Sequence, residues 1–293
     1  MKEFPIPVRM VGPGSQPEDD DELQYLAMPR EMNTFRMPMV PSGVDDDALA
    51  TTRDLLAQFL AAMNDWNPAA DRHGPQLGLA EVPPAALTIA NQMLGEGEVS
   101  IQVAGTPSYR IQESVFTGVW RVCRFDADGR QTGDWIEAGM LPRVALDVAR
   151  AAAAPALPPV AVPEGAMNAP ALLHEIAGQM RDRPPGTPAH VINLTLFPMV
   201  PDDHTLLHAA LPVGPVAMMS RGFGNCRITS THARDVWRVQ YFNNMNTLIL
   251  NTIEVVDVPE VAQAALEDLD DSRGRLAELI EWVSESCAEQ ASN

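Results

Sequence analysis

The stretch VWRVCRF at residues 119–125 returns as VWRVQYF at residues 236–242, in a chain that contains only five Trp. When the chain is aligned with itself at this offset, 16 of the 52 pairs between residues 94 and 145 are identical. Composition alone would give roughly three or four identities. The same offset continues upstream through pairs such as Leu55/Leu172 and Pro84/Pro201. We therefore interpret the pattern as a duplicated domain.

The duplication divides the chain into five parts. An irregular N-terminal arm at 1–50 precedes copy one at 51–150, and an Ala/Pro linker at 151–166 leads to copy two at 167–267. The linker composition favours a stiff, extended segment. Residues 268–293 are predicted to form a C-terminal helix, because Leu276, Leu279, Ile280 and Val283 follow a helical spacing.

Each copy has the same predicted order of elements. An amphipathic helix opens it, and a short apolar strand, a second helix near 84–94 or 201–211, and three or four short strands follow. A helix beginning at Pro142 or Pro259 closes it. Helices segregated from antiparallel strands make an α+β fold. We therefore predict two tandem α+β domains, packed together or standing apart, each with a small antiparallel sheet of three to five strands.

The letters shared by the two copies predict a structural pair in each. Period two places the Trp of the VWRV strand on one face, where we expect it to belong to the core, and the Arg on the other. A Glu recurs on the adjoining strand, so we expect a cross-strand Arg–Glu ion pair in both copies. The residues concerned are Trp120, Arg121 and Glu137 in copy one, and Trp237, Arg238 and Glu254 in copy two.

The stretch RGFGNCRIT at 221–229 differs from its counterpart in copy one, AGTPSYRIQ. Glycines and an Asn before a Cys are typical of a turn that tolerates positive φ. We interpret Gly224, Asn225, Cys226 and Arg227 as a structural turn or a partner contact. The alternative, a catalytic thiol at Cys226, needs a base such as His232 and a lowered thiol pKa.

His204 and His208 of copy two lie four residues apart and can share a metal ion on one helix face. The sequence has no HExxH glutamate and no third ligand close to this pair, so two ordinary helix histidines are the favoured interpretation. No catalytic triad or phosphate loop stands out. The sequence therefore predicts no enzyme, no metal site and no cofactor.

The N-terminal arm contains two unusual segments. The acidic run at 18–22 is typical of a solvated face and is also able to hold a basic peptide. Met28, Met32, Phe35 and Met37 belong to a Met-rich stretch. Such stretches adapt to varied apolar partners, or they lie as an extended arm along the chain's own domains.

The formal net charge of −19 disfavours nucleic acid and anionic membranes as partners, because the long-range field repels them. Three widely spaced Cys give no disulfide framework. No apolar stretch is long enough to span a membrane, and the first residues lack a signal-peptide pattern. We therefore expect a cytoplasmic protein that neither binds nucleic acid nor inserts into a membrane.

Several motifs, in order along the chain, resemble the hydrogenase expression/formation proteins of the HupH/HyaF/HoxQ family. They are GPGSQPED at 12–19, YLAMPREMNTFRMP at 25–38, SRGFGNCRITSTHARDVWRVQYFN at 220–243 and LILNTIEVVDVPEVA at 248–262. The resemblance covers the chain from Pro7 to about Trp282, and the conserved region of the family occurs twice. It carries over contact motifs rather than catalytic residues, including Gly12, Gly14, Ser15 and Gln16.

The resemblance implies a role in the maturation of an uptake [NiFe]-hydrogenase. The implied role is that of a non-catalytic chaperone, which holds the iron–sulfur small-subunit precursor before twin-arginine export and protects it under oxygen. A thioredoxin-like protein of the same operon is the second implied partner. An acidic chaperone suits a basic signal segment.

Two alternatives stay open. The first is a redox- or metal-handling factor that delivers or protects an iron–sulfur cluster through Cys226, His204 and His208. The second is a structural adaptor for other maturation factors.

Overall fold

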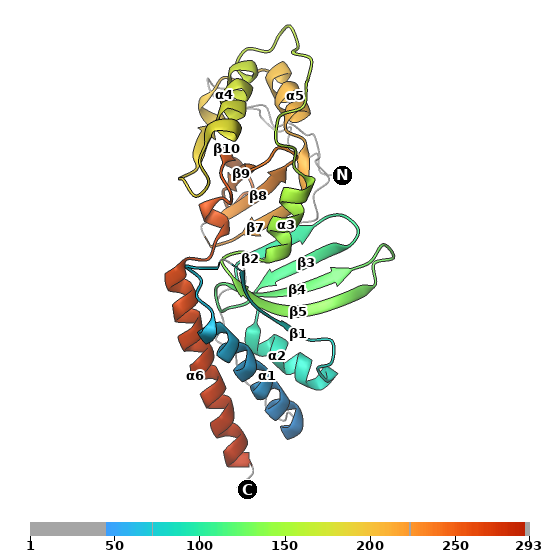
Figure 1. Cartoon of the computed structure of the whole chain (residues 1–293), viewed down its shortest axis with the longest axis vertical. Helices are drawn as coiled ribbons and strands as arrows, with labels where there is room; N and C mark the ends of the chain where they lie inside the picture. Colours follow the sequence, from blue (N-terminus) through green and yellow to red (C-terminus); the bar gives the residue numbers. More distant parts are fainter. Residues whose placement is uncertain (1–44, 72, 223, 291–293) are drawn as a thin grey trace, which may run out of the picture.

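The computed structural model describes residues 45–71, 73–222 and 224–290, and Figure 1 shows how their helices and strands are arranged. The predicted contacts in the N-terminal arm, from Gly12 to Met37, lie outside these residues. The first described helix begins after Asp45, whose side chain accepts a hydrogen bond from the Ala48 N–H at 3.2 Å. This N-cap satisfies a backbone donor that the first turn of the helix leaves open.

Copy one follows the predicted order of helices and strands. Its elements are α1 (Asp46–Asp65), β1 (His73–Gly78), α2 (Pro84–Leu94), β2 (Val99–Val103), β3 (Ser108–Glu113), β4 (Val119–Phe125), β5 (Gln131–Gly139) and α3 (Arg143–Ala152).

Copy two repeats this order apart from two 3-10 turns. The helix predicted to begin at Pro259 is only a 3-10 turn, η2 (Glu260–Ala262). The other elements are α4 (Ala169–Asp182), β6 (His190–Asn193), the 3-10 turn η1 (Leu194–Leu196), α5 (Pro201–Ala210), β7 (Val213–Ser220), β8 (Asn225–Thr231), β9 (Val236–Phe242), β10 (Leu248–Val255) and the C-terminal helix α6 (Leu266–Gln290).

The α+β class is confirmed, but the prediction of two separate small sheets is wrong. The described strands form one ten-stranded sheet in the order β1-β5-β4-β3-β2-β7-β8-β9-β10-β6, with all pairs antiparallel. Strand β2 of copy one pairs with β7 of copy two, and Ile101 lies opposite its own repeat equivalent, Met218. Joining the two inner edges satisfies backbone groups that each half would otherwise expose.

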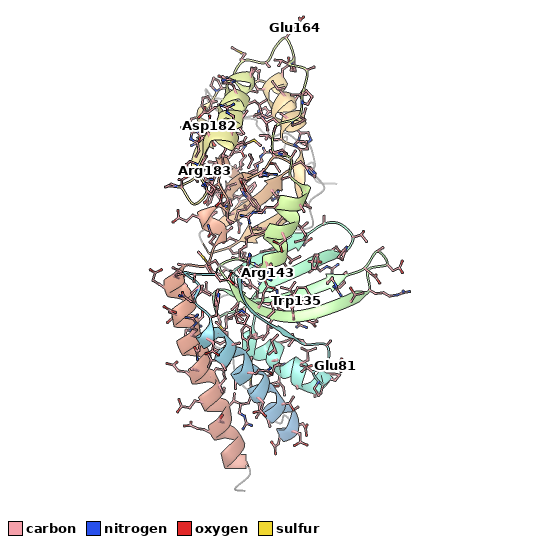
Figure 2. The ribbon with its side chains drawn as sticks, in the orientation of Figure 1. Glu81, Trp135, Arg143, Glu164, Asp182 and Arg183 are labelled. Atoms are coloured by element: carbon pink, nitrogen blue, oxygen red, sulfur yellow. The ribbon has the colours of Figure 1, made fainter. Side chains whose placement is uncertain are left out.

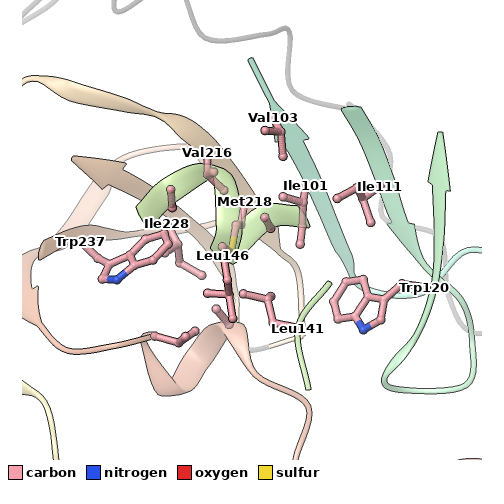
Figure 3. Packing of buried hydrophobic residues seen from close by; sticks show 14 of the residues in the cluster. Ile101, Val103, Ile111, Trp120, Leu141, Leu146, Val216, Met218, Ile228 and Trp237 are labelled. Atoms are coloured by element: carbon pink, nitrogen blue, oxygen red, sulfur yellow. The ribbon is translucent and has the colours of Figure 1, made fainter. Parts of the chain in front are cut away.

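The largest core lies on one side of this joint and takes side chains from both copies (Figure 3). Ile101, Val216 and Met218 form its middle, with Trp120 on one side and Trp237 on the other. The two indoles are anchored alike: Trp120 Nε1 donates to the Gly139 carbonyl at 2.9 Å and Trp237 Nε1 to the Val256 carbonyl at 3.1 Å. The predicted core role of both tryptophans therefore agrees with the structure.

Helices cover the outer strands on the opposite side of the sheet. Helices α1, α2 and α6 pack on copy one, where Val119 and Ile136 are buried, and α4 and α5 pack on copy two, where Val236 and Ile253 are buried. The molecule is therefore elongated, with a helical layer near each end of the sheet (Figure 1).

The segment that follows each copy in the sequence packs on the other copy. Helix α6 follows copy two but packs on α1 of copy one, where Leu276 and Val283 are buried. The linker follows copy one but lies on copy two, where the Ala154 N–H donates to the His232 carbonyl at 2.8 Å. Its Leu157 and Val160 pack against the copy-two core. Each copy is thus covered by a segment that leaves the other.

Candidate functional site

The described residues of the RGFGNC segment lie between β7 and β8 and at the start of β8. Gly224 has φ of 88°, a conformation that favours glycine, and forms a bridge with Gly222. Asn225 and Arg227 follow at the start of β8, and both are half-buried. The turn predicted from the sequence is present, and it sets the side of the sheet to which each following residue points.

Cys226 lies on the core side of the sheet, is only 1% exposed and faces Tyr241 of β9. Burial raises the pKa of its thiol to about 12. A thiol in that state is neutral at physiological pH and a poor nucleophile. His232, the base considered from the sequence, instead uses Nδ1 to contact the Ala152 carbonyl at 2.9 Å. The geometry therefore supports the structural interpretation over a catalytic or redox thiol.

His204 and His208 lie on α5, with His204 half-buried and His208 exposed. Among the described residues, no group of three or more His, Cys, Asp or Glu has an arrangement that could hold a metal ion. In the part of the chain that the structure describes, His204 and His208 therefore have no third ligand with which to hold a metal ion.

The residue that sequence reasoning missed in this region is Asp203, which is completely buried. Its carboxylate accepts hydrogen bonds from the N–H groups of Met167, Asn168 and Ala169 at 2.8–2.9 Å, and from that of Val200 at 3.1 Å. Burial acts to raise the carboxyl pKa, but these four hydrogen bonds outweigh it, so the pKa lies below its ordinary value. An acidic residue soon after Pro201 was the available signal.

The predicted Arg–Glu ion pairs are wrong in both copies. Trp120 lies opposite Glu137 and Trp237 opposite Glu254, so each Glu shares a face with the Trp and not with the Arg. The side chain of Glu137 instead accepts from Gln76 Nε2 at 2.7 Å, from Trp135 Nε1 at 2.8 Å and from the Arg143 N–H at 2.8 Å. Trp135 and Arg143 are both labelled in Figure 2, near the base of α3.

The arginines have different partners at equivalent positions. Arg121 forms a salt bridge with Asp134 at 2.7 Å and a hydrogen bond with Asn91. Arg238 donates from Nε to the amide oxygen of Asn251 at 3.2 Å. Since Asn251 is the repeat equivalent of Asp134, the pairing recurs but changes from charged to neutral. The prediction had paired each Arg with a Glu that lies one residue out of register and therefore on the other face of the sheet.

Four arginines share the face of the sheet opposite the main core. Strand pairing places Arg110 and Arg121 on this face in copy one, and Arg227 and Arg238 in copy two. We call it the arginine face. In the described structure, the buried apolar clusters on this side take their strand residues from the outer strands.

Exposed apolar side chains concentrate in copy two. Met245, Leu248 and Ile249, in the β9–β10 hairpin, are 85%, 37% and 56% exposed. Nearby Leu196 is 77% exposed, and its turn η1 packs against β10. The hairpin positions are Asp128, Gln131 and Thr132 in copy one. Together Leu196, Met245, Leu248 and Ile249 form what we call the apolar tip, the type of surface that binds partners.

The chain matches the family described as HupH hydrogenase expression protein, C-terminal conserved region, at residues 49–154 and again at 166–283. It is 44% identical to the hydrogenase expression/formation protein HoxQ of Cupriavidus necator, over 97% of this chain and 99% of that protein. It is 40% identical to HupH of Rhodobacter capsulatus, over 96% and 98% of the two chains.

A more distant relative is the hydrogenase-1 operon protein HyaF of Escherichia coli, which is 30% identical over 94% of this chain and 96% of that protein. A solved structure of the hydrogenase expression protein HupH from Thiobacillus denitrificans is 27% identical, with a TM-score of 0.35 over 39% of this chain and 95% of that chain.

Proposed function

The chain belongs to the family of HupH-type hydrogenase expression proteins, and from that premise we propose that it is a non-catalytic assembly factor for the iron–sulfur small subunit of an uptake [NiFe]-hydrogenase. It holds the precursor before twin-arginine export and protects it under oxygen. The observation that carries this proposal is the apolar tip of copy two, whose three hairpin residues Met245, Leu248 and Ile249 are replaced by polar residues in copy one.

Two further properties support a holding role. Monomeric proteins rarely leave a group of large apolar side chains in water, so such a surface favours binding of an apolar segment. The net charge of −19 favours a partner that is also basic, because opposite charges speed encounter and suppress wrong partners. A signal segment with arginines followed by an apolar stretch combines these properties.

The site of action that we propose is the cytoplasm, where the precursor is made, and the second partner is a thioredoxin-like maturation protein. No described helix is long and apolar enough to cross a membrane. Because the precursor is made in the cytoplasm, its binding would precede its passage to the membrane.

The test transplants copy-one residues into copy two. The full-length variant Met245→Asp/Leu248→Gln/Ile249→Thr is compared with wild type for co-purification with the small-subunit precursor in a hydrogenase-expressing host. We expect at least a tenfold loss of recovered precursor, because the apolar contact area is removed.

The matched control is Val162→Thr/Met167→Gln, which removes exposed apolar side chains from the linker region instead. It is expected to retain the precursor. Undiminished recovery by the triple variant would reject the apolar tip as the binding site. Failure of wild type to recover any hydrogenase component, at every oxygen level, would reject the function itself.

A further inference from the structure

The turn between β8 and β9, at residues 232–235, has a different environment from its repeat equivalent at 115–118. In copy one α6 packs on the turn, and Ser272 Oγ donates to the Thr117 carbonyl at 2.9 Å. In copy two the last two residues of the turn instead line an open pocket of about 360 Å³, which is large enough for a small ligand. We call it the Asp235 pocket, and it is lined by Arg150, Pro185, Arg234, Asp235 and Asp257.

Asp235 has a backbone conformation that residues with a side chain rarely adopt. Its φ is 57°, and its repeat equivalent Gly118 has φ of 79°. Glycine adopts positive φ without a steric penalty, whereas Asp tolerates it better than most residues but less well than glycine. Copy two therefore keeps the shape of the turn and adds a carboxylate at a conformational cost. Residues in such conformations cluster at binding sites.

The Asp235 carboxylate lacks a hydrogen-bond donor. Within the described part of the chain, no side-chain or backbone group donates a hydrogen bond to it. Burial and then the neighbouring Asp257 raise its pKa, although three nearby arginines act in the opposite direction. A partly buried carboxylate is stabilised in its ionised form by N–H donors. A ligand that supplies such a donor would therefore gain a charge-assisted hydrogen bond here.

Arg150 and Arg234 bring two guanidinium groups to the same pocket. Both residues are exposed, and neither side chain forms a hydrogen bond or a salt bridge with another described residue. Arg183, labelled in Figure 2, differs from them because its side chain is only 7% exposed and forms a salt bridge with Asp257 at 3.4 Å. The pocket therefore offers donors for a carboxylate beside an acceptor for an N–H group.

We propose that the Asp235 pocket binds a carboxylate whose Cα carries an amide N–H, as in an N-acylated amino acid or at the C-terminus of a polypeptide. Arg150 and Arg234 bind the carboxylate through N–H···O bonds, and the ligand N–H donates to Asp235. The charge of Asp235 disfavours multiply charged anions such as phosphate, and the arginines disfavour a cationic ligand. This binding goes beyond the proposed function and does not rest on it.

The experiment measures protection of arginines from phenylglyoxal in the full-length chain. Mass spectrometry follows the modification of Arg150 and Arg234 separately from that of Arg130, a copy-one arginine whose side chain is 77% exposed. We expect N-acetylalanylalanine to protect Arg150 and Arg234 at a concentration at least tenfold lower than acetate or the amidated dipeptide requires. Acetate lacks the N–H donor, and the amidated dipeptide lacks the carboxylate. Arg130 is expected to remain unprotected.

Asp235→Gly introduces the copy-one residue and tests the role of the carboxylate. Glycine suits the positive φ, so the turn is expected to keep its conformation. In this variant we expect the dipeptide and acetate to protect Arg150 and Arg234 at concentrations within threefold of each other. The matched control Asp147→Asn removes an exposed carboxylate one turn from Arg150 on α3. It is expected to retain the tenfold preference for the dipeptide.

Equal protection by the dipeptide, acetate and the amidated dipeptide would overturn the proposal. Stronger protection by inorganic phosphate would also overturn it, and so would a preference that survives in Asp235→Gly. An acetylated tetra-alanine distinguishes the two sources of the ligand: tighter protection than by N-acetylalanine assigns the pocket to a polypeptide C-terminus, and equal or weaker protection assigns it to a small molecule. None of these measurements uses a hydrogenase component, so their failure would leave the proposed function intact.

Discussion

Copy one and copy two have nearly the same order of helices and strands, but the segments that pack over them, which we call their covers, are very different. Copy one lies under α6, a helix of 25 residues whose Leu276 is completely buried. Copy two lies under the Ala/Pro linker, whose Leu157 is only partly buried. The difference teaches that a duplicated fold keeps its sheet and its tryptophans while the covering segments diverge.

The residues under these covers also differ between the two copies. In copy one, α6 packs so closely on Gly118 that a Cβ there would lie 2.2 Å from a Leu269 methyl carbon. The equivalent residue in copy two is Asp235, which lines an open pocket of about 360 Å³ with Arg150, Pro185, Arg234 and Asp257. Burial and the nearby Asp257 raise the pKa of Asp235. A charged, open surface thus replaces a helix contact.

The largest expected effect comes from truncating one apolar side chain in each of the two covering segments. Leu276→Ala in α6 is expected to reduce the free energy of unfolding by about 2–5 kcal/mol, as for other fully buried leucines. Leu157→Ala in the linker is expected to cost about 1 kcal/mol or less, since that side chain loses less apolar contact. Urea denaturation measures both. Equal losses would contradict the difference between the covers.

The second effect concerns a buried acid that copy two replaces with an alcohol. Glu113 is 5% exposed and accepts from the Gly118 N–H at 3.1 Å, whereas its equivalent Ser230 accepts from the Val216 N–H at 3.0 Å. Burial raises the pKa of Glu113 from 4.5 to about 7. The folded state therefore binds a proton more tightly than the unfolded state, and the cost of the buried charge grows as pH rises from about 4.5 and is complete above about 7.

Glu113→Gln is accordingly expected to raise stability above pH 8 by up to about 3 kcal/mol relative to wild type, less the loss of one charged hydrogen bond. Below about pH 4.5 the advantage should vanish, because wild type is then neutral at this position. Unfolding free energies at pH 5 and pH 8 measure the change. A variant-minus-wild-type difference that does not grow with pH would contradict the buried-charge account.

The third prediction concerns the Arg121–Asp134 pair, which one substitution converts into the Arg–Asn pair of copy two. Asp134→Asn removes the carboxylate that binds Arg121 and is expected to cost about 1 kcal/mol at low salt and less at high salt. Burial, and then Asp134, raise the pKa of the Cys123 thiol. The variant should therefore alkylate severalfold faster at pH 8 at Cys123. Cys123→Ser identifies that signal, and an unchanged rate would contradict the role of Asp134.

The smallest expected effect on stability belongs to the apolar tip. Met245→Asp/Leu248→Gln/Ile249→Thr alters exposed side chains, so the free energy of unfolding should change by no more than about 0.5 kcal/mol. Thermal unfolding beside the co-purification assay would measure this. A large loss of stability would mean that the tip supports the fold, and lost binding would then have no specific meaning.

The sequence alone predicted most of the local structure. The offset between copies, the amphipathic helices and the Gly and Asn turns predicted the order of elements and the roles of Trp120 and Trp237, because these depend on neighbouring residues and on periodicity. The ion-pair error was also avoidable from the sequence. Pairing β4 and β5 across the 126–130 turn puts Arg121 opposite Ile136 and next to Asp134.

The joining of the two sheets and the crossing of α6 were not predictable in this way. Both depend on contacts between residues more than 100 positions apart, and an alternating strand such as β2 fits equally well at an edge or in the middle of a sheet. The position of Cys226 depends on strand parity after a glycine turn, which fixes whether the thiol faces the core or the arginine face.

The Ile101–Met218 pair at the middle of the sheet has a consequence for the history of the chain. Each residue faces its own equivalent, as across the two-fold axis of a homodimer, where one surface binds a second copy of itself. In such a dimer every substitution appears twice, so an apolar tip or a neutral Asn beside an arginine would be present in both subunits. Once one polypeptide contained both halves, each could change alone, and one could keep the scaffold while the other acquired a binding surface.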